Sequence, residues 1–322
     1  MICHPHVKIN LGLHVLRRRD DGFHDLETLF VPFHGIRDTL EIVPGDSFLT
    51  LFPASPRHPE PCHSEPCHSE PCHSEPCHSE PCHSERSEES ISQSITPDGK
   101  VLVTIRKAGG VGWDPAGDLT VRAYQLLDAD FHLPPVKIYL EKHAPVGAGL
   151  GGGSSDAAFA LRMVSELFGL NLSDEALAGY ASRLGSDCAF FVYDCPMLGT
   201  GRGEVLSQCD GMRLAPDGSI VLRSGARYRI EVVVPEGISV STAEAYRGIV
   251  PMERTPGNSL TDVLRRPVER WRECLVNDFE TTVFAVHPTL ARYKEALYGR
   301  GAVYAAMSGS GSALFGLFPE LS

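Results

Sequence analysis

Long apolar runs and an excess of basic charge are both missing from this sequence of 322 residues. No uncharged apolar stretch approaches the roughly 18 residues of a membrane-spanning helix. Residues 1–15 also lack the basic segment and apolar core of a secretory signal. Asp and Glu outnumber Lys and Arg by 41 to 29, which gives a net charge of −12. Because nucleic acids and membrane surfaces are polyanionic, neither is an expected partner, and we expect a cytoplasmic protein that holds any anionic ligand in a local site.

The cysteine spacing lacks the patterns of a metal site or a disulfide framework. No CxxC pair of the kind found in structural zinc sites occurs in the chain. Outside residues 54–97 the cysteines are odd in number and scattered. They are Cys3, Cys188, Cys195, Cys209 and Cys274. This usage is typical of a reduced protein, and the candidate site residues include no metal ligand.

One segment, residues 54–97, has almost no residue that could build a core. Five copies of PCHSE occupy residues 61–85. Alternating apolar runs flank the segment, DTLEIVPGDSFLTLF before it and KVLVTIRKAG after it, which predicts a hairpin whose loop carries a disordered insert. A long surface insertion adds little closure entropy, so the fold tolerates it. The repeated Cys-His pairs leave a second interpretation open, in which the insert captures zinc or another soft metal.

The glycine-rich stretch APVGAGLGGGSSDAAFAL, residues 144–161, is the strongest functional signal. Gly147, Gly149 and Gly152 satisfy GxGxxG, but the next segment reads as a second helix capped by Ser173 rather than as the parallel strand of a dinucleotide fold. A P-loop is disfavoured because no Lys-Ser or Lys-Thr follows the glycines. Neither common nucleotide loop explains the pattern.

The physical reading of this stretch is an anion site at a helix N-terminus. Residues 135–142 predict a strand, and apolar residues from Ser155 onward follow helical spacing until Gly169. Free backbone N–H groups and the positive end of the helix dipole favour a phosphate there, and glycines let it approach the backbone. Ser154 and Ser155 offer hydroxyl donors and a cap. Asp156 reads either as a capping carboxylate or as a base for an attacking hydroxyl.

These residues resemble the GHMP kinases, whose central motif is approximately Pro-x-x-x-Gly-Leu-Gly-Ser-Ser-Ala. Three further stretches agree with the family in the expected order: KINLGLHVLRRRDDGFHDLETLF from Lys8, LGSDCAFFV from Leu184 and MSGSGSALFGLF from Met307. The resemblance covers nearly the whole chain except residues 54–97. It implies a two-domain α+β fold, with a ribosomal protein S5 domain 2-like ATP-binding domain at 1–170 and a ferredoxin-like domain at 171–322. The active site would lie between them.

The resemblance also implies roles for individual residues. Asp156 matches the catalytic aspartate that accepts the substrate hydroxyl proton, and Lys8 the lysine beside it. ATP is the implied phosphate donor, with Mg²⁺ neutralising the charge of the transferred group. The residues implied to hold ATP are Pro145, Gly147, Ala148, Gly149, Leu150, Gly151, Gly152, Gly153, Ser154 and Ser155.

One branch of the family, which phosphorylates the 2-hydroxyl of 4-diphosphocytidyl-2-C-methyl-D-erythritol, fits the motifs in most detail. In that branch an aromatic ring stacks on cytosine and a histidine reads its edge, which points to Phe23 and His24, with Leu198 on the opposite face. The remaining implied substrate residues are Asn10, Asp187, Gly309 and Gly311. For Asp187, a purely structural role in its loop is an equal alternative.

Other hypotheses stay open at the level of sequence. The chain could be a GHMP kinase for a different alcohol, a binding protein that has kept the fold, or a metal-scavenging protein organised by the PCHSE repeat. Intact Lys8, Asp156 and glycine loops favour an enzyme acting on a small molecule. We expect it to be a monomer or a homodimer.

Overall fold

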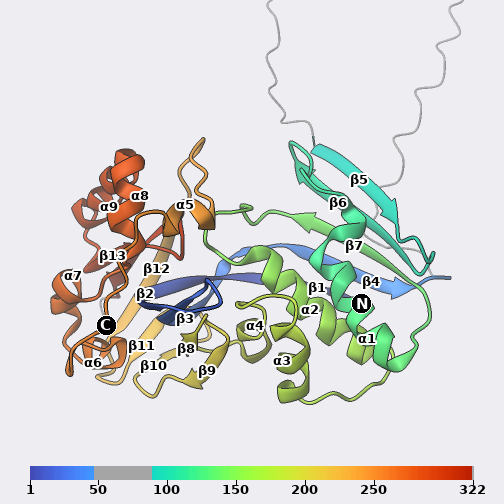
Figure 1. Ribbon diagram of the computed structural model, residues 1–322, viewed down its shortest axis with the longest axis horizontal. Coiled ribbons are helices and arrows are strands. Elements are labelled where there is room, and N and C mark those ends of the chain that lie inside the picture. The colour runs from blue at the N-terminus through green and yellow to red at the C-terminus, as the bar shows by residue number, and fades with distance from the viewer. Residues whose placement is uncertain (47–88, 321–322) are drawn as a thin grey trace, which may run out of the picture.

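The computed structural model describes residues 1–46 and 89–320, which form three antiparallel or mixed sheets flanked by helices (Figure 1). The first sheet has the order β1-β4-β7-β6-β5, and only β6 and β7 pair in parallel. Its strands are β1 (Ile2–Cys3), β4 (Thr39–Pro44), β5 (Glu89–Ile95), β6 (Val101–Ala108) and β7 (Val136–Lys142). Helix α1 (Leu119–Phe131) makes the crossover that the parallel pair requires.

The second and third sheets are antiparallel. The second has the order β2-β3-β8-β9 and the third the order β10-β11-β12-β14-β13. The strands of the second sheet are β2 (His6–Arg18), β3 (His24–Arg37), β8 (Met197–Gly201) and β9 (Val205–Gln208). Those of the third are β10 (Met212–Leu214), β11 (Ile220–Leu222), β12 (Arg227–Val233), β13 (Tyr304–Met307) and β14 (Leu314–Pro319).

Most of the longer helices form two groups. In Figure 1, α1, α2 and α3 lie below the centre and toward the right and α7, α8 and α9 at the left, with β2 and β3 between the two groups. The remaining bounds are η1 (Pro115–Gly117), α2 (Gly152–Leu167), α3 (Asp174–Ser182), α4 (Phe190–Tyr193), α5 (Thr242–Tyr246), α6 (Leu260–Leu264), η2 (Val268–Arg270), α7 (Trp271–Cys274), α8 (Phe279–Val286) and α9 (Pro288–Gly299). Within residues 1–46 and 89–320, no helix has the length and apolar character needed to cross a bilayer.

Three apolar cores hold these elements together. The first lies between the sheet of β4, β6 and β7 and the helices α1 to α4. The second packs β2 against the third sheet and Trp271, and the third packs the end of β2 against α8 and α9. Helices α3 and α4 belong to the first core, which extends to Met197. The packing therefore continues past residue 170, where the sequence suggested a domain boundary.

The strand predictions around the PCHSE repeat need correction. Strands β4 and β6 are not hairpin partners, because β7 lies between them in the sheet. Strand β6 instead forms its antiparallel pair with β5, whose residues were assigned to the insert. The residues between β4 and β5 thus connect opposite sides of the sheet. The repeat itself lies outside the described residues.

The elements around the glycine-rich stretch match the sequence more closely. Strand β7 and the cap of α3 are confirmed, with Ser173 Oγ accepting the Ala176 N–H at 3.3 Å. Helix α2 begins earlier than predicted. Its N-cap is Gly151, with φ of +73° and no side-chain cap, so the predicted serine cap is wrong.

Candidate active site

A cavity of about 1070 Å³ is lined by residues of β2, β3 and β7 and of several loops. Its wall comes from β2, the tip of the β2–β3 hairpin, the glycine-rich loop, and residues from the C-terminal half. The wall includes Lys8, Asn10, Phe23, His24, Trp113, Asp118, Lys142, Pro145, Gly147, Ala148, Gly149, Gly151, Gly152, Gly153, Ser154, Asp156, Asp187, Arg202, Tyr246 and Gly309. Segments distant in sequence thus contribute to one site.

The glycine-rich loop forms one end of the cavity. Gly147, Gly149 and Gly151 all have φ between +73° and +76°, a backbone conformation that residues other than glycine rarely adopt. A Cβ at Gly149 would also collide with the Ser308 carbonyl oxygen, so two loops meet there. The loop leads directly into α2, whose first N–H groups have no partner within the helix. The end of the cavity thus has the geometry and the partial charge of a phosphate site.

Lys8 lines the cavity and is only 3% exposed. Its Nζ atom donates to Asn10 Oδ1 and, at 3.0 Å, to the Gly149 carbonyl oxygen, and it lies 3.2 Å from Asp187 Oδ2. Asn10 in turn donates from Nδ2 to Thr28 Oγ1 at 3.0 Å. The buried Lys8 ammonium is therefore held by Asn10 of β2 and by the glycine-rich loop. It faces the Asp187 carboxylate, which is about one-third exposed.

Asp156 is buried against other partners. Its Oδ2 accepts from Lys142 Nζ, which also donates to Asp38. Asp38 Oδ1 accepts the N–H groups of His143 and Ala144 at 2.6 and 2.7 Å, at the point where β7 leads into the glycine-rich loop. Asp38, Lys142 and Asp156 form a buried triad that fixes the base of the loop. The ion pairs thus join Lys8 to Asp187 and Lys142 to Asp156.

The charges within the triad influence one another. Burial raises the pKa of Asp156 well above its usual range, the Asp38 carboxylate adds to this, and Lys142 opposes it. Burial disfavours the Lys142 ammonium, but the two carboxylates outweigh burial and raise the pKa of Lys142. The triad therefore retains its cation, and Asp156 Oδ1, which is buried without a hydrogen-bond partner among the described residues, can accept from a further donor.

The opposite end of the cavity is aromatic. Phe23, at the hairpin tip, is 54% exposed, and the Arg202 guanidinium lies 5.0 Å from its ring centre. His24 stacks on Tyr246 with ring centres 4.6 Å apart and planes 22° apart. Burial lowers the pKa of His24, with Arg18 adding to the effect, which favours a neutral ring. This end offers flat faces and a histidine edge for a planar ligand group.

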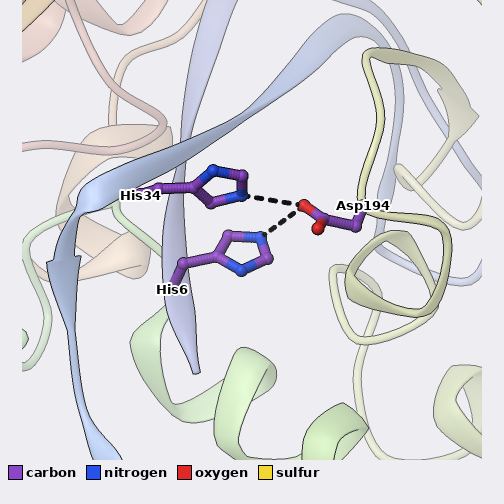
Figure 2. A group of neighbouring side chains, drawn as sticks. All are labelled: His6, His34 and Asp194. Atoms are coloured by element: carbon purple, nitrogen blue, oxygen red, sulfur yellow. Dashed lines mark hydrogen bonds and ion pairs between the residues drawn. The ribbon is translucent and has the colours of Figure 1, made fainter. Parts of the chain in front are cut away.

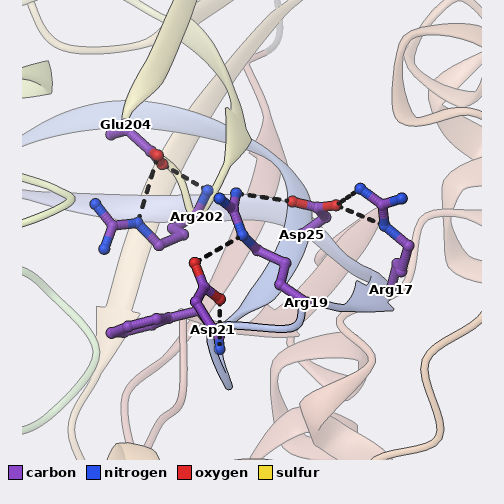
Figure 3. A network of polar contacts seen from close by, with 7 residues as sticks. Arg17, Arg19, Asp21, Asp25, Arg202 and Glu204 are labelled. Carbon is purple, nitrogen blue, oxygen red and sulfur yellow. Dashed lines mark hydrogen bonds and ion pairs between the residues drawn. The ribbon is translucent and has the colours of Figure 1, made fainter.

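A polar network holds the hairpin tip in place (Figure 3). Asp21 accepts the Phe23 N–H at 3.0 Å, and Asp25 accepts from both Arg17 and Arg19. The hydrogen bond from Arg17 is the main cause of the lowered pKa of Asp25. Phe23 is exposed, yet its backbone is fixed by residues outside the cavity.

Several predicted site residues do not reach the cavity. Its wall, as far as residues 1–46 and 89–320 form it, does not include Leu150, Ser155, Leu198 or Gly311. Leu150 packs in the second core and Leu198 against it, so Leu198 is not placed to cover the second face of a base. Ser155 is buried within α2. Gly311 packs on Met307, while Gly309 stays on the wall, with its carbonyl oxygen held by Asn277 at 2.9 Å.

Sequence reasoning missed Lys142, Arg202 and Tyr246 on the wall. Lys142 ends the predicted strand immediately before the glycine-rich loop, which was an available signal. Tyr246 and Arg202 carry no local signal, because only the fold brings them to His24 and Phe23.

Known proteins resemble this chain along almost its full length. The GHMP kinases N terminal domain model matches residues 118–195, and the GHMP kinases C terminal model matches residues 259–322. A Bacteroides fragilis protein named 4-diphosphocytidyl-2-C-methyl-D-erythritol kinase is 39% identical over 322 residues, covering 99% of this chain and 93% of the relative. A Cytophaga hutchinsonii protein of the same name is 35% identical, covering 99% of this chain and 92% of the relative.

Solved structures agree with the relatives. A crystal structure of 4-(cytidine 5'-diphospho)-2C-methyl-D-erythritol kinase has a TM-score of 0.63 at 27% identity and covers 98% of this chain and 90% of its own. The Methanococcus jannaschii mevalonate kinase shares the fold, with a TM-score of 0.54 at 12% identity over 99% of this chain and 90% of its own. The predicted α+β GHMP kinase fold is confirmed. The chain belongs to the GHMP kinase family and, within it, to the 4-diphosphocytidyl-2-C-methyl-D-erythritol kinases.

Proposed function

We propose that the protein catalyses ATP-dependent phosphorylation of the 2-hydroxyl of 4-diphosphocytidyl-2-C-methyl-D-erythritol, in the non-mevalonate route to isoprenoid precursors. The observation that carries the proposal is the 3.2 Å pair between Lys8 and Asp187. The pair lies on the wall of one cavity with the glycine-rich loop and with the aromatic hairpin tip. A phosphate donor at the loop and a cytosine at the aromatic end would meet at this pair.

We propose Asp156 as the general base and keep Asp187 as the second candidate. Asp156 lines the cavity, and besides the Oδ2 atom that pairs with Lys142 it has an Oδ1 atom that is buried without a hydrogen-bond partner among the described residues; Asp187 is partly exposed beside Lys8. In the proposed step Asp156 accepts the hydroxyl proton and the substrate oxygen forms a bond to the γ-phosphorus. The bond from the γ-phosphorus to the bridging oxygen breaks and ADP leaves, while the Lys8 ammonium stabilises the charge on the transferring group.

The residues present fit both ATP and Mg²⁺. Positive-φ glycines and the N-terminus of α2 provide backbone donors for the phosphates. The cavity wall also provides the oxygen ligands that Mg²⁺ prefers, from Ser154, Asp118 and Asp187. When bound, Mg²⁺ would neutralise phosphate charge. We further propose that the protein acts in the cytoplasm as a monomer or homodimer, which suits an enzyme whose proposed substrate is a small, charged molecule.

Phosphorus NMR with ATP, Mg²⁺ and the cytidine substrate tests this proposal. We expect a new phosphomonoester signal with the wild type and a rate at least about 10²-fold lower with a folded Asp156→Asn variant, the usual minimum contribution of a general base. Asp187→Asn should keep more activity than Asp156→Asn. The reverse order would assign the base role to Asp187 instead.

A kinase for a different alcohol is the second candidate, and a substrate panel separates the two. Mevalonate and homoserine lack a planar base to occupy the end formed by Phe23, His24 and Tyr246. We expect Phe23→Ala to raise KM for the cytidine substrate more than KM for ATP. Efficient turnover of mevalonate or homoserine, with none of the cytidine substrate, would overturn the proposal.

A further inference from the structure

Two histidines and an aspartate from three separate elements converge outside the active site (Figure 2). His6 begins β2, His34 lies on β3, and Asp194 follows α4. The Nε2 atoms of His6 and His34 lie 3.2 and 3.0 Å from the same Asp194 Oδ1 atom. One ligand atom from each residue lies within 4.8 Å of the other two. None of the three is among the described residues that line the active-site cavity.

His6 carries the main structural signal of this cluster, because its buried Nε2 atom makes no hydrogen bond of good geometry among the described residues, although Asp194 Oδ1 lies 3.2 Å away. The side chain is about 4% exposed. Its ring packs edge-on against His34 at 4.4 Å and against Phe159 and Phe191 at 5.5 and 5.7 Å between ring centres. A buried nitrogen is seldom left without a hydrogen bond, so an Nε2 atom that contacts a carboxylate oxygen without hydrogen-bond geometry needs an explanation.

The three side chains supply the donor types that a cation of the zinc class takes. His6 and His34 each offer an imidazole nitrogen and Asp194 offers a carboxylate oxygen.

We propose that His6, His34 and Asp194 bind one divalent transition-metal ion of the zinc class. Zinc takes imidazole nitrogens and carboxylate oxygens at about 2 Å, so the present separations allow an ion to replace the direct contacts between the side chains. The Asp194 side chain is 51% exposed, which gives the ion a path from solvent and leaves room for water as a further ligand. This site is separate from any metal binding by the PCHSE repeat.

A bound ion would act as a structural brace. It would tie the C-terminal end of α4 to β2 and β3, two strands that also carry the cavity residues Lys8 and Phe30. Asp194 stands seven positions after Asp187 and has φ of +47°, an uncommon conformation for a non-glycine residue. Because the ion binds only the folded arrangement, it should raise the free energy of unfolding.

Zinc titration of the full chain tests the site, with a chelator as competitor. The cysteines should first be alkylated, so that thiolates of the repeat do not bind the ion. The test variants are His34→Ala, which removes a partly exposed ligand, and Asp194→Asn, which keeps a residue that tolerates positive φ. His4→Ala is the matched control, because His4 is an exposed histidine beside the site.

We expect one high-affinity zinc ion in the wild type and in His4→Ala, bound at least about tenfold more weakly in both test variants. Zinc should raise the unfolding midpoint of the wild type and the control by more than those of the test variants. With cobalt, the difference spectrum between wild type and His34→Ala should show visible d–d bands without thiolate charge transfer. Equal zinc affinity and equal midpoints in all four proteins would overturn the proposal and leave a hydrogen-bonded cluster only.

Discussion

Two lysines near the phosphate loop differ in the carboxylates they face. Lys8 meets the partly exposed Asp187, whereas Lys142 is buried between Asp38 and Asp156. A partly exposed partner such as Asp187 can be displaced by a substrate, which suits a lysine that acts on the substrate. A fully buried ion pair suits a lysine that fixes the backbone. The partners therefore predict a chemical role for Lys8 and a positioning role for Lys142.

Removing the Lys142 charge should destabilise the fold strongly. Lys142→Met keeps most of the side-chain volume but leaves two buried carboxylates without their cation. Loss of one partner of a buried ion pair costs about 3 to 5 kcal/mol, and we expect a decrease in that range in the free energy of unfolding from urea titration.

The matched control for Lys142→Met is Lys107→Met, because within residues 1–46 and 89–320 the exposed hydrogen bond of the Lys107 ammonium goes to a backbone carbonyl oxygen and not to a carboxylate. Its effect should stay within about 0.5 kcal/mol. A loss below about 1 kcal/mol for Lys142→Met would show that Asp38 and Asp156 do not depend on this cation.

At the scale of elements, the active site is a contact between loops. The glycine-rich loop touches the turn after β13, where Ser308 Oγ donates to the Gly149 carbonyl oxygen at 3.0 Å and Ala313 N donates to the Ala148 carbonyl oxygen at 3.1 Å. Lys8 donates to the same Gly149 oxygen. The loop conformation, the Lys8 position and the C-terminal glycine turn are therefore coupled.

Gly149→Ala should disrupt this junction. The new Cβ would meet the Ser308 carbonyl oxygen, and the residue would be held at φ of +76°. Because a displacement of about 1 Å in an active site can lower the rate about 10²-fold, we expect a loss of that order in kcat/KM for ATP.

Gly179→Ala is the control for this prediction, since Gly179 lies in α3 and a Cβ added there would meet no atom within 4 Å. It should leave kcat/KM unchanged and stabilise the protein by about 0.5 to 1 kcal/mol. Near-normal kinetics for Gly149→Ala would mean that the two loops separate freely during turnover.

Local patterns predicted local elements and failed where pairing partners are distant. Strand β7 and the Ser173 cap follow from alternation and from one side chain. The partner of β6 did not follow, because sequence adjacency suggested β4 while the parallel crossover through α1 places β7 between them. The weak polar run of β5 carries too little apolar alternation to be read as a strand.

The candidate site shows the same limit. Motif matching found Lys8, the glycine loop and both hairpin-tip residues, all of which line the cavity. The base role of Asp156, which the family resemblance implies, stays a prediction, and the motifs did not show that residue 187 supplies the carboxylate beside Lys8. Only the fold determines which of two carboxylates a buried lysine faces.

For the whole molecule, the long strands β2 and β3 connect the three cores. β2 contributes Val7, Ile9 and Leu11 to the second core and Leu13 and Val15 to the third, while Phe30 of β3 packs in the first. Unfolding of one core would free part of β2 or β3, and the other cores pack on the same two strands. The two halves of the molecule should therefore unfold together rather than as separate domains.

The two tryptophans of the chain can test this cooperativity, because they lie in different halves. Trp113 packs beside the first core with its indole N–H on Asp118, and Trp271 is fully buried in the second. In Trp113→Phe and Trp271→Phe, one indole remains as the reporter. We expect its fluorescence midpoint in urea to coincide with the far-UV circular dichroism midpoint of the same variant. The comparison within each variant removes the effect of the substitution on stability. Separate midpoints would instead show that β2 and β3 do not transmit unfolding between the cores.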